Sequence, residues 1–175
     1  KENLLERVPD GPRRIIANLP YNIATPLLTG WLEQIHADPT AFESMTLMFQ
    51  KEVAQRICSK HGSKTYGIIS VLIQAYYHAE YLFDVPRESF NPPPKVISGV
   101  LRLTRKDNLS LNCNPKFLKQ IVKMAFNQRR KTLRNSLKQL INNDAVKELD
   151  VFNKRPEALS VVASIHLTNP LDTHR

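Results

Sequence analysis

Cysteine and glycine are scarce in this sequence, and their scarcity narrows what the protein can be. The two cysteines, Cys58 and Cys113, lie far apart and form no C-x-x-C pair, which argues against a disulfide framework. We therefore expect reduced thiols and a cytoplasmic location. The five glycines form no G-x-G anywhere, so the 175 residues contain no glycine-rich loop of the kind that cradles a nucleotide-like cofactor.

Other absences exclude whole classes of protein. No apolar run approaches the roughly 18–20 residues that span a bilayer, and no signal peptide is recognisable, so we expect no membrane association. The five histidines show no metal-ligand spacing, and we expect no metal site. With 42% hydrophobic and 23% charged residues, the composition is that of a globular protein with one medium domain or a domain plus a small appendage.

Negative charge is missing from one long stretch of the chain. The net charge is +9, and no acidic residue lies between Asp107 and Asp144. That interval holds eight cations: Lys116, Lys119, Lys123, Arg129, Arg130, Lys131, Arg134 and Lys138. A basic surface of this kind is expected to bind a polyanion, with nucleic acid as the first candidate. The alternative is an ordinary solvated helix face, which is what most charged runs are.

The first part of the chain alternates strand and helix patterns. Strands are predicted at residues 14–17, 44–49, 80–86 and 96–103, the first of them buried. Helices are predicted at residues 25–35, 50–59 and 67–76, the first with Thr25 as N-cap and Pro26 at its first position. The alternation is typical of an α/β sheet. Only helical patterns follow residue 112, so we place a boundary near residues 106–112.

The first predicted strand ends in Asn18-Leu19-Pro20-Tyr21, and in open α/β sheets ligands bind beyond the carboxyl ends of strands. Pro20 biases Leu19 toward an extended conformation, so the turn is stiff and its carbonyls point outward. The Asn18 amide oxygen beside such a carbonyl makes a pair of acceptors, as an exocyclic amine with two hydrogens requires. Tyr21 adds a ring on which a base could stack. The alternative is a turn that merely ends a strand.

A pair of acceptors suits alkylation of a nucleobase amine. The lone pair of the adenine amine is delocalised into the ring and is a poor nucleophile. Accepting both of its hydrogens would favour a pyramidal nitrogen whose lone pair points at an electrophilic methyl group. Orientation and polarisation carry such a step, and no charged base is needed.

A second motif, "FNPPPKVIS" at residues 90–98, contains three consecutive prolines. They pre-organise an extended segment, which would present Phe90 with little loss of entropy. The alternative is a rigid connector with Phe90 in the core.

A third motif, "FNQRRKTLRNSL" at residues 126–137, combines arginines with regularly spaced leucines. Arg130, Arg134 and Lys138 are spaced by four, so on a helix they would share one face. Leu133, Leu137 and Leu140 would pack on another face. Arginine side chains bind phosphates and stack on bases, which again indicates nucleic acid.

Taken together, the three motifs resemble one family. N-L-P-Y after a strand, F-x-P-x-P-K-V-x-S some seventy residues later, and then "AFNQRRKTLRNSL" are similar to the rRNA adenine dimethyltransferases, above all the bacterial KsgA type, which acts on small-subunit rRNA. "FQKEVAQRI", "SKTYG" and "RPEALSV" also resemble that family. The similarity runs from about residue 12 to about residue 170.

The resemblance implies a fold and an activity. Residues 1–108 would be part of the catalytic domain, namely the C-terminal part of an α/β, Rossmann-like class I methyltransferase sheet, and residues 109–175 a small all-helical RNA-binding domain. The activity would be S-adenosylmethionine-dependent dimethylation of the exocyclic amines of two adjacent adenosines near the 3′ end of small-subunit rRNA, during ribosome biogenesis. The partner would be that rRNA or the pre-small ribosomal subunit, and we expect a monomer.

The resemblance also assigns roles to residues. Asn18 and the Leu19–Pro20 backbone would hold the adenine amine, with Asn18 also close to S-adenosylmethionine. Tyr21 and Phe90 would clasp the flipped base between their rings. Five cations would bind rRNA, chiefly through its phosphates: Arg129, Arg130, Lys131, Arg134 and Lys138.

The sequence departs from the family at one place. The family's glycine-rich cofactor loop and its ribose-binding acidic residue lie upstream of N-L-P-Y, where this chain has only seventeen residues. The sequence therefore resembles a fragment, and we predict that residues 1–175 alone bind S-adenosylmethionine poorly or not at all. Two other functions remain open: an antibiotic-resistance methyltransferase of large-subunit rRNA, and a ribosome-assembly factor that binds RNA without catalysis.

Overall fold

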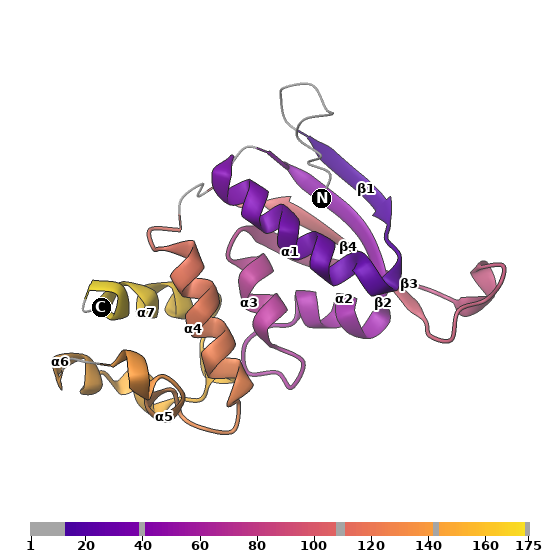
Figure 1. The fold of residues 1–175 in the computed structure, drawn as a ribbon. Coiled ribbons are helices and arrows are strands. Elements are labelled where there is room, and N and C mark those ends of the chain that lie inside the picture. The colour runs from indigo at the N-terminus through magenta and orange to yellow at the C-terminus, as the bar shows by residue number, and fades with distance from the viewer. Residues whose placement is uncertain (1–12, 39–40, 108–110, 142–143, 174–175) are drawn as a thin grey trace. The chain divides into compact units, whose positions relative to one another are not determined.

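The computed structural model describes residues 13–38, 41–107, 111–141 and 144–173 (Figure 1). They divide into two compact units. The described residues within 1–55 and 77–109 form a sheet unit, and those within 56–76 and 110–175 form a helical unit.

The sheet unit contains four strands in the order β1-β2-β4-β3. Their bounds are Arg14–Asn18 for β1, Ser44–Gln50 for β2, Tyr77–Val85 for β3 and Ser98–Arg105 for β4. β1 runs parallel to β2, and β4 runs antiparallel to β2 and to β3. The four predicted strands are confirmed, although β3 begins three residues earlier than expected because Tyr77 already pairs with Arg105 of β4.

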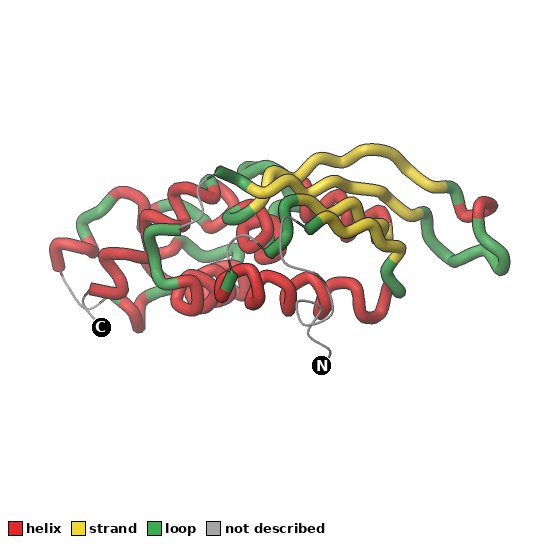
Figure 2. The backbone as a smooth tube through the Cα atoms, turned by 90° about the horizontal axis from the view of Figure 1, so that it is seen from above, coloured by secondary structure: helices red, strands yellow, loops and turns green. Residues whose placement is uncertain are grey.

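One face of this sheet packs beneath helix α1 (Tyr21–Ala37), as Figure 1 shows and Figure 2 repeats from a second direction. Alternate residues of the inner strands point to that face and are fully buried, with Leu28 and Ile35 of α1 buried above them. The strand residues are Met45, Leu47, Phe49, Leu101 and Leu103. Burying each such side chain contributes about 1.5–3 kcal/mol, so this layer is the core of the unit.

β1 differs from the buried strand that was expected. Among the described residues it pairs only with β2. The side chain of Ile16, on one face of the strand, is 86% exposed. Ile15 and Ala17 point to the other face and are half-buried. The expectation of burial was wrong because a β-branched run indicates a strand but not how many of its faces are covered.

Helix α1 begins earlier than the sequence indicated. Its first residue is Tyr21, and Pro26 lies inside it. The amides of Ile23 and Ala24 donate to the Pro20 carbonyl (3.1 and 3.0 Å), which closes the first turn without Thr25 as a cap. Pro26 is tolerated because it removes one bond, to the Asn22 carbonyl, on an exposed side of the helix where water can replace it.

The helical unit contains the longer helices α4 (Pro115–Asn127) and α7 (Val161–Thr173) and the shorter α3 (Ile68–Gln74), α5 (Leu133–Ser136) and α6 (Asp144–Lys147). Three 3-10 turns complete it: η3 (Lys138–Leu140), η4 (Asp150–Asn153) and η5 (Pro156–Ala158). Asn114 caps α4 by accepting from the amides of Lys116 and Phe117. The buried core includes Phe117, Leu133, Leu137 and Phe152, so the predicted packing of Leu133 and Leu137 is confirmed.

Helix α2 (Lys51–Cys58) crosses from one unit to the other, and residues 56–76 belong to the helical unit. There α3 contacts α4 and α7, and Gln74 Nε2 donates to the carbonyls of Ile57 and Ser59 (2.8 Å each). The sequence pattern assigned this segment to the first domain, since apolar periodicity does not show which partner buries a helix. The expected boundary at residues 108 and 109 lies outside the described residues.

Among the described residues, no helix is long and apolar enough to cross a membrane. No group of three or more His, Cys, Asp or Glu side chains in the same part of the chain is arranged to hold a metal ion.

Candidate active site

The carboxyl ends of β1, β2 and β3 lie at one edge of the sheet. Asn18 at the end of β1 aligns with Met48, which aligns with Val100 near the start of β4. Val85 at the end of β3 aligns with Ser98, the first residue of β4. The Asn18–Tyr21 turn and the segment of residues 86–97, which contains the second motif, therefore arise from the same edge, as Figures 1 and 2 both show.

The Asn18–Pro20 turn combines a buried anchor with an exposed amide. Asn18 is exposed, the Leu19 side chain is buried, and Pro20 is exposed with φ −55° and ψ 132°. Two helical amides donate to the Pro20 carbonyl and so use both of its lone pairs. The Leu19 carbonyl is then the backbone acceptor that can work beside Asn18. Tyr21 is the first residue of α1, and its side chain lies outside what the structure describes.

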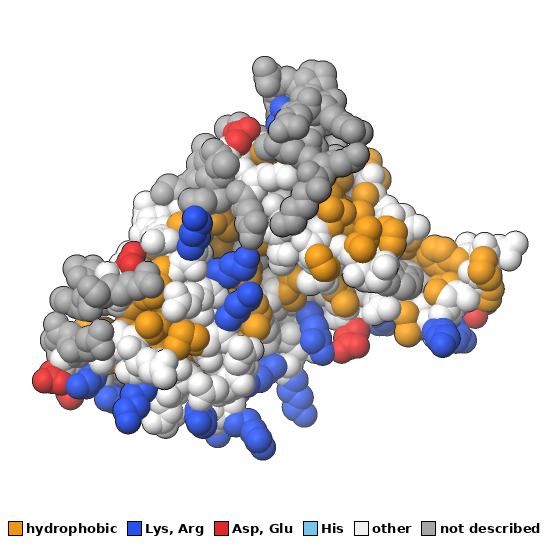
Figure 3. Space-filling model, in the orientation of Figure 1, with side chains coloured by type: hydrophobic (Ala, Val, Ile, Leu, Met, Phe, Trp, Pro, Cys, Tyr) orange, Lys and Arg blue, Asp and Glu red, His pale blue; other side chains and the backbone are white. Residues whose placement is uncertain are grey.

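Residues 86–97 extend beyond the sheet and begin with the 3-10 turn η2 (Arg87–Ser89). Phe90 follows this turn in extended conformation, and its amide donates to the Arg87 carbonyl (3.2 Å). The Phe90 side chain is half-buried, whereas Phe83, Val96 and Ile97 expose 56%, 42% and 42% of their surfaces. Figure 3 shows hydrophobic side chains gathered over this extension, which gives the edge an apolar surface suited to a flat ring.

A small charged network lies at the base of the same segment. Lys51 Nζ is 2.6 Å from Asp84 Oδ2, and the Tyr81 hydroxyl donates to Asp84 Oδ1. Lys51 and Tyr81 together lower the pKa of the Asp84 carboxyl below its usual value, chiefly through these hydrogen bonds. Asp84 is therefore ionised at neutral pH and is no candidate for a proton donor. No sequence motif predicted this network.

The glycine that the described strands place at this edge is covered by a side chain. A nucleotide-like cofactor usually needs glycine backbone that it can approach closely. Gly99 is the one glycine of β4. The Tyr81 side chain fills the space beside it, since a Cβ at Gly99 would lie 2.5 Å from the Tyr81 hydroxyl oxygen. Asn18 is the single predicted cofactor contact at the edge, so these residues alone do not fit the whole cofactor.

The two cysteines, Cys58 and Cys113, form no disulfide bond. Burial, and then the nearby Asp172 carboxylate, raise the pKa of Cys113 to about 11, so this thiol stays neutral at physiological pH.

Arg129 is held inside the helical unit. Its Nη2 donates to the Ser63 carbonyl (3.2 Å), and its Nε lies 3.7 Å from Glu157 Oε2. The Gly62 amide donates to the Glu157 carbonyl (2.7 Å), which secures the same contact from the other side. These bonds join three segments that are far apart in the sequence, namely the loop around Ser63, the turn after α4 and η5.

The single basic helix face that was expected is wrong. Helix α4 ends at Asn127 and α5 begins only at Leu133, so Arg130 and Lys131 lie exposed in the turn between them. The Leu133 amide donates to the Lys154 carbonyl (2.8 Å) instead of the carbonyl four residues earlier, and this contact breaks the helix. Arg134 donates from Nε and Nη2 to Asn153 Oδ1 (3.4 and 3.3 Å), and Lys138 is exposed in η3.

The structure adds cations that the sequence analysis did not select. The loop that Arg129 and Glu157 hold carries the exposed residues Lys60 and Lys64, so these join Arg130 and Lys131 on the helical unit. Figure 3 shows Lys and Arg side chains gathered on this unit. The "SKTYG" similarity could have pointed to the loop, but not to its neighbour 66 residues further along the chain.

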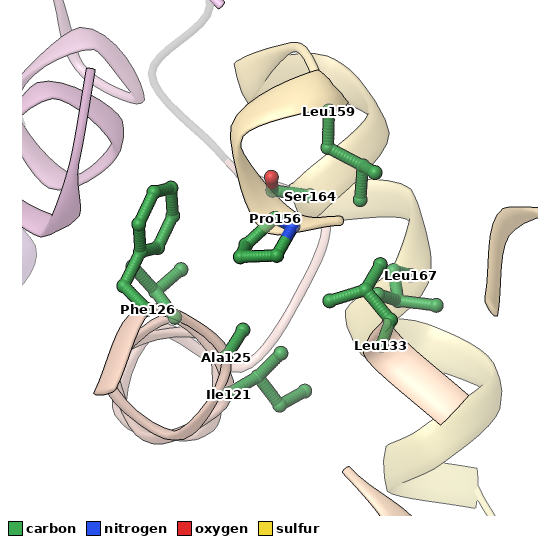
Figure 4. A pocket seen from close by; sticks show the side chains of 9 residues that line it. Ile121, Ala125, Phe126, Leu133, Pro156, Leu159, Ser164 and Leu167 are labelled. Atoms are coloured by element: carbon green, nitrogen blue, oxygen red, sulfur yellow. The ribbon is translucent and has the colours of Figure 1, made fainter. Parts of the chain in front are cut away.

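A void within the helical core is not a ligand site. It measures about 10 Å³, room for one water at most, and its lining is almost entirely apolar. Figure 4 shows the side chains of α4 facing those of α5, η5 and α7 across it.

Comparison with known proteins is consistent with this geometry. The family model described as ribosomal RNA adenine dimethylase matches residues 7–166. A Bacteroides fragilis protein named ribosomal RNA small subunit methyltransferase A is 52% identical over 170 residues, which cover 96% of this chain and 61% of that protein. A Flavobacterium johnsoniae protein of the same name is 53% identical over 158 residues, covering 90% and 59%. The chain thus spans about three fifths of the length of these relatives.

Two solved structures share the fold. A dimethyladenosine transferase from Plasmodium falciparum matches with a TM-score of 0.80 at 23% identity, over 99% of this chain and 72% of that one. The 23S rRNA methyltransferase ErmE matches with a TM-score of 0.62 at 19% identity, over 93% and 67%. These likenesses confirm the expected Rossmann-like α/β class. By the match of its sequence over most of its length, the chain belongs to the ribosomal RNA adenine dimethylase family.

Proposed function

We propose that the protein containing this chain dimethylates the exocyclic amines of two adjacent adenosines near the 3′ end of small-subunit rRNA, with S-adenosylmethionine as methyl donor. The observation that carries the proposal is the Asn18–Pro20 turn, an exposed amide beside a fixed backbone at the carboxyl edge of the sheet. The relatives named for small-subunit rRNA support the substrate class. The protein would act in the cytoplasm, as a monomer and without a metal, during ribosome biogenesis.

Asn18 and Leu19 would orient the reacting amine. The Asn18 side-chain oxygen and the Leu19 carbonyl each accept one of its two N–H bonds, because the Pro20 carbonyl is already used by α1. The buried Leu19 side chain and the start of α1 hold the backbone of both residues in place, and this fixed backbone would help to orient the amine.

The target base would lie against the apolar surface of the same edge. Phe90, presented by its proline-rich segment, supplies one ring, and Tyr21 at the start of α1 supplies the other. A base must leave its stack to reach such a site, and stacking on aromatic rings offsets part of that free-energy cost.

The cofactor supplies an electrophilic methyl group when it is bound. This chain contributes Asn18 to that site, while the glycine-rich loop of the family has no counterpart in the 175 residues. The chain's own residues therefore account for the acceptor side of the reaction.

The helical unit would hold the rRNA. The predicted phosphate-binding residues are Arg129, Arg130, Lys131, Arg134 and Lys138, and we now give Arg129 a supporting role because Ser63 and Glu157 engage it. We place residues up to 108 in the catalytic domain and the rest in the RNA-binding domain, with the 56–76 segment attached to the latter. Phosphate contacts of this kind set position and not sequence choice.

Two rival functions make different predictions. A large-subunit rRNA methyltransferase shares the base-binding turn, and a non-catalytic assembly factor shares only the RNA-binding surface. The identity of about half the residues with relatives named for small-subunit rRNA favours the first proposal over both.

Transfer of labelled methyl groups separates the three. The protein, with whatever residues precede this chain in its gene, is incubated with labelled S-adenosylmethionine and with undermethylated small or large ribosomal subunits. We expect label on two adjacent adenosines of small-subunit rRNA only. Label on large-subunit rRNA would support the resistance-type enzyme, and RNA binding without any label would support an assembly factor.

A further inference from the structure

One residue, Lys51, makes non-covalent contacts that connect the ends of β2 and β3 where the 86–97 segment leaves the sheet. Lys51 follows β2 directly and is the first residue of α2. Its ammonium group contacts Asp84, the penultimate residue of β3 (2.6 Å), while its backbone amide donates to the Ile97 carbonyl (2.9 Å), just before β4. Lys51 therefore contacts the chain on both sides of the segment that carries Phe90.

A β-bulge makes this arrangement possible. Tyr81 pairs with Leu101, but Phe83 pairs with Val100 and Asp84 with Gly99, so β3 has one extra residue. In a regular strand, residues 81 and 84 would point to opposite faces. The extra residue brings them to the same face, where the Tyr81 hydroxyl reaches Asp84.

Gly99 completes the arrangement. The Tyr81 side chain lies over this glycine, and any Cβ there would stand 2.5 Å from its hydroxyl oxygen and 2.9 Å from two ring carbons. Because residue 99 has no side chain, the Tyr81 ring can lie over β4 at this point while its hydroxyl reaches Asp84, three residues further along β3. Within the segment itself, the hydrogen bond from Arg87 Nη1 to the Lys95 carbonyl is long (3.5 Å). The contacts that Lys51 makes where the segment joins the sheet are shorter than this one.

We propose that Lys51, Asp84 and Tyr81 form a clamp that fixes the 86–97 segment, so that Lys51 and Asp84 are positioning residues for the base that Phe90 would contact. This proposal rests on the proposed function, because Phe90 has a base to contact only if the protein modifies one. Exposed ion pairs generally contribute little to global stability. The clamp is accordingly expected to act on the segment's position and hardly on unfolding.

The chain offers a matched control. Arg14 Nε lies 3.0 Å from Glu43 Oε2, another exposed ion pair of the sheet unit, at the amino ends of β1 and β2. It touches no part of the 86–97 segment that carries Phe90. Glu43→Gln therefore reports what the loss of an exposed pair does by itself.

Hydrogen exchange tests the clamp without reference to activity. In Lys51→Met and in Asp84→Asn, amides of residues 86–97 should exchange about tenfold faster than in the parent protein. The reason is that loss of the Lys51–Asp84 ion pair permits local opening of the segment. Lys51→Arg should restore most of the protection, and Glu43→Gln should leave it unchanged. Unchanged exchange in both clamp variants would overturn the proposal.

Steady-state kinetics then test the positioning role. With undermethylated small subunits, Lys51→Met should lower kcat/KM about tenfold through a higher KM for RNA, with affinity for S-adenosylmethionine unchanged. The charge exchange Lys51→Asp with Asp84→Lys should recover part of the loss. Faster exchange with an unaltered KM would refute the positioning role. A parent protein without methyl transfer would refute the proposed function, and the exchange data would still decide whether the clamp exists.

Discussion

Asn18 illustrates how one residue can be exposed and still be placed accurately. Its backbone is paired with β2 on one side and continues into the buried Leu19 on the other, so its amide is accessible while its position is set. An exposed polar residue at such a place contributes little to stability. This placement agrees with the functional role proposed for Asn18.

Replacing Asn18 should separate catalysis from binding. Asn18→Ala removes one acceptor at the reacting amine, so we expect methyl transfer to fall by at least about a hundredfold while RNA affinity changes less than about twofold. Single-turnover transfer and filter binding on the same RNA measure the two effects. A parallel loss of RNA affinity would show that the turn is structural.

Two buried tyrosines make a second comparison at this scale. The Tyr77 hydroxyl donates to the Phe42 carbonyl (2.8 Å), whereas the Tyr66 hydroxyl, also buried, has no hydrogen-bond partner among the described residues. Tyr77→Phe should therefore destabilise by about 1–3 kcal/mol, and Tyr66→Phe should be neutral or stabilise by about 1 kcal/mol. Urea unfolding at neutral pH checks both, and equal losses would contradict the assignment.

The same tyrosines predict how stability depends on pH. Burial raises the pKa of each to about 12. Because an unfolded tyrosine ionises near pH 10, the buried neutral form stabilises the fold fully below pH 10, and this contribution is lost as the pH rises toward 12. Unfolding midpoints measured from pH 9 to 12 should fall less steeply in Tyr66→Phe than in the parent. An identical slope would argue against ionisation of Tyr66.

At the scale of elements, the turn between α4 and α5 shows how one contact gives neighbouring cations different environments. The Lys154 carbonyl captures the Leu133 amide and ends the helical path, which leaves Arg130 and Lys131 exposed. Arg129, their neighbour in sequence, instead joins two loops through Ser63 and Glu157. Adjacent cations therefore have different contacts and exposure, which charge counting does not distinguish.

Neutralising these cations one group at a time should separate residues that bind rRNA from residues that stabilise the fold. Replacing Arg130 and Lys131 by Gln should weaken rRNA binding and reduce the slope of log affinity against log salt by about 0.7–0.9 per cation removed. Arg129→Gln should instead lower the unfolding free energy by about 1 kcal/mol, because it leaves a partly buried Glu157 without its partner. An unaltered salt slope in the double variant would mean that the turn is only a solvated surface.

At the scale of the whole molecule, the two units divide the proposed task. The sheet unit carries the edge proposed to bind the base, and the helical unit carries the densest positive charge. The chain interleaves them, since residues 56–76 lie between two parts of the sheet unit and yet pack among the later helices. The helical unit is therefore built from two separate parts of the sequence.

The cofactor prediction also belongs to this scale. Residues 1–175 contain no G-x-G, and the described edge shows no glycine-lined cradle, so S-adenosylmethionine should bind the isolated chain weakly, with a dissociation constant above about 1 mM. Isothermal titration calorimetry with residues 1–175 measures this dissociation constant. Micromolar binding by residues 1–175 would show that other residues form the site.

Several features follow from the sequence by itself. The β-branched and alternating runs determined the four strands, the leucine spacing determined the buried face near Leu133, and three ordered motifs determined the family. These are local patterns, and local patterns depend on propensity and periodicity that are present in the chain before it folds.

Tertiary structure decided the rest. Ile16 is exposed because that face of β1 is left uncovered, the basic helix breaks because of the Lys154 carbonyl, and the clamp at Lys51 needs a bulge that only pairing with β4 reveals. The last two depend on a partner residue tens of positions away. Such contacts leave no periodic trace in the sequence, since they are selected by packing and hydrogen-bond competition in the folded chain.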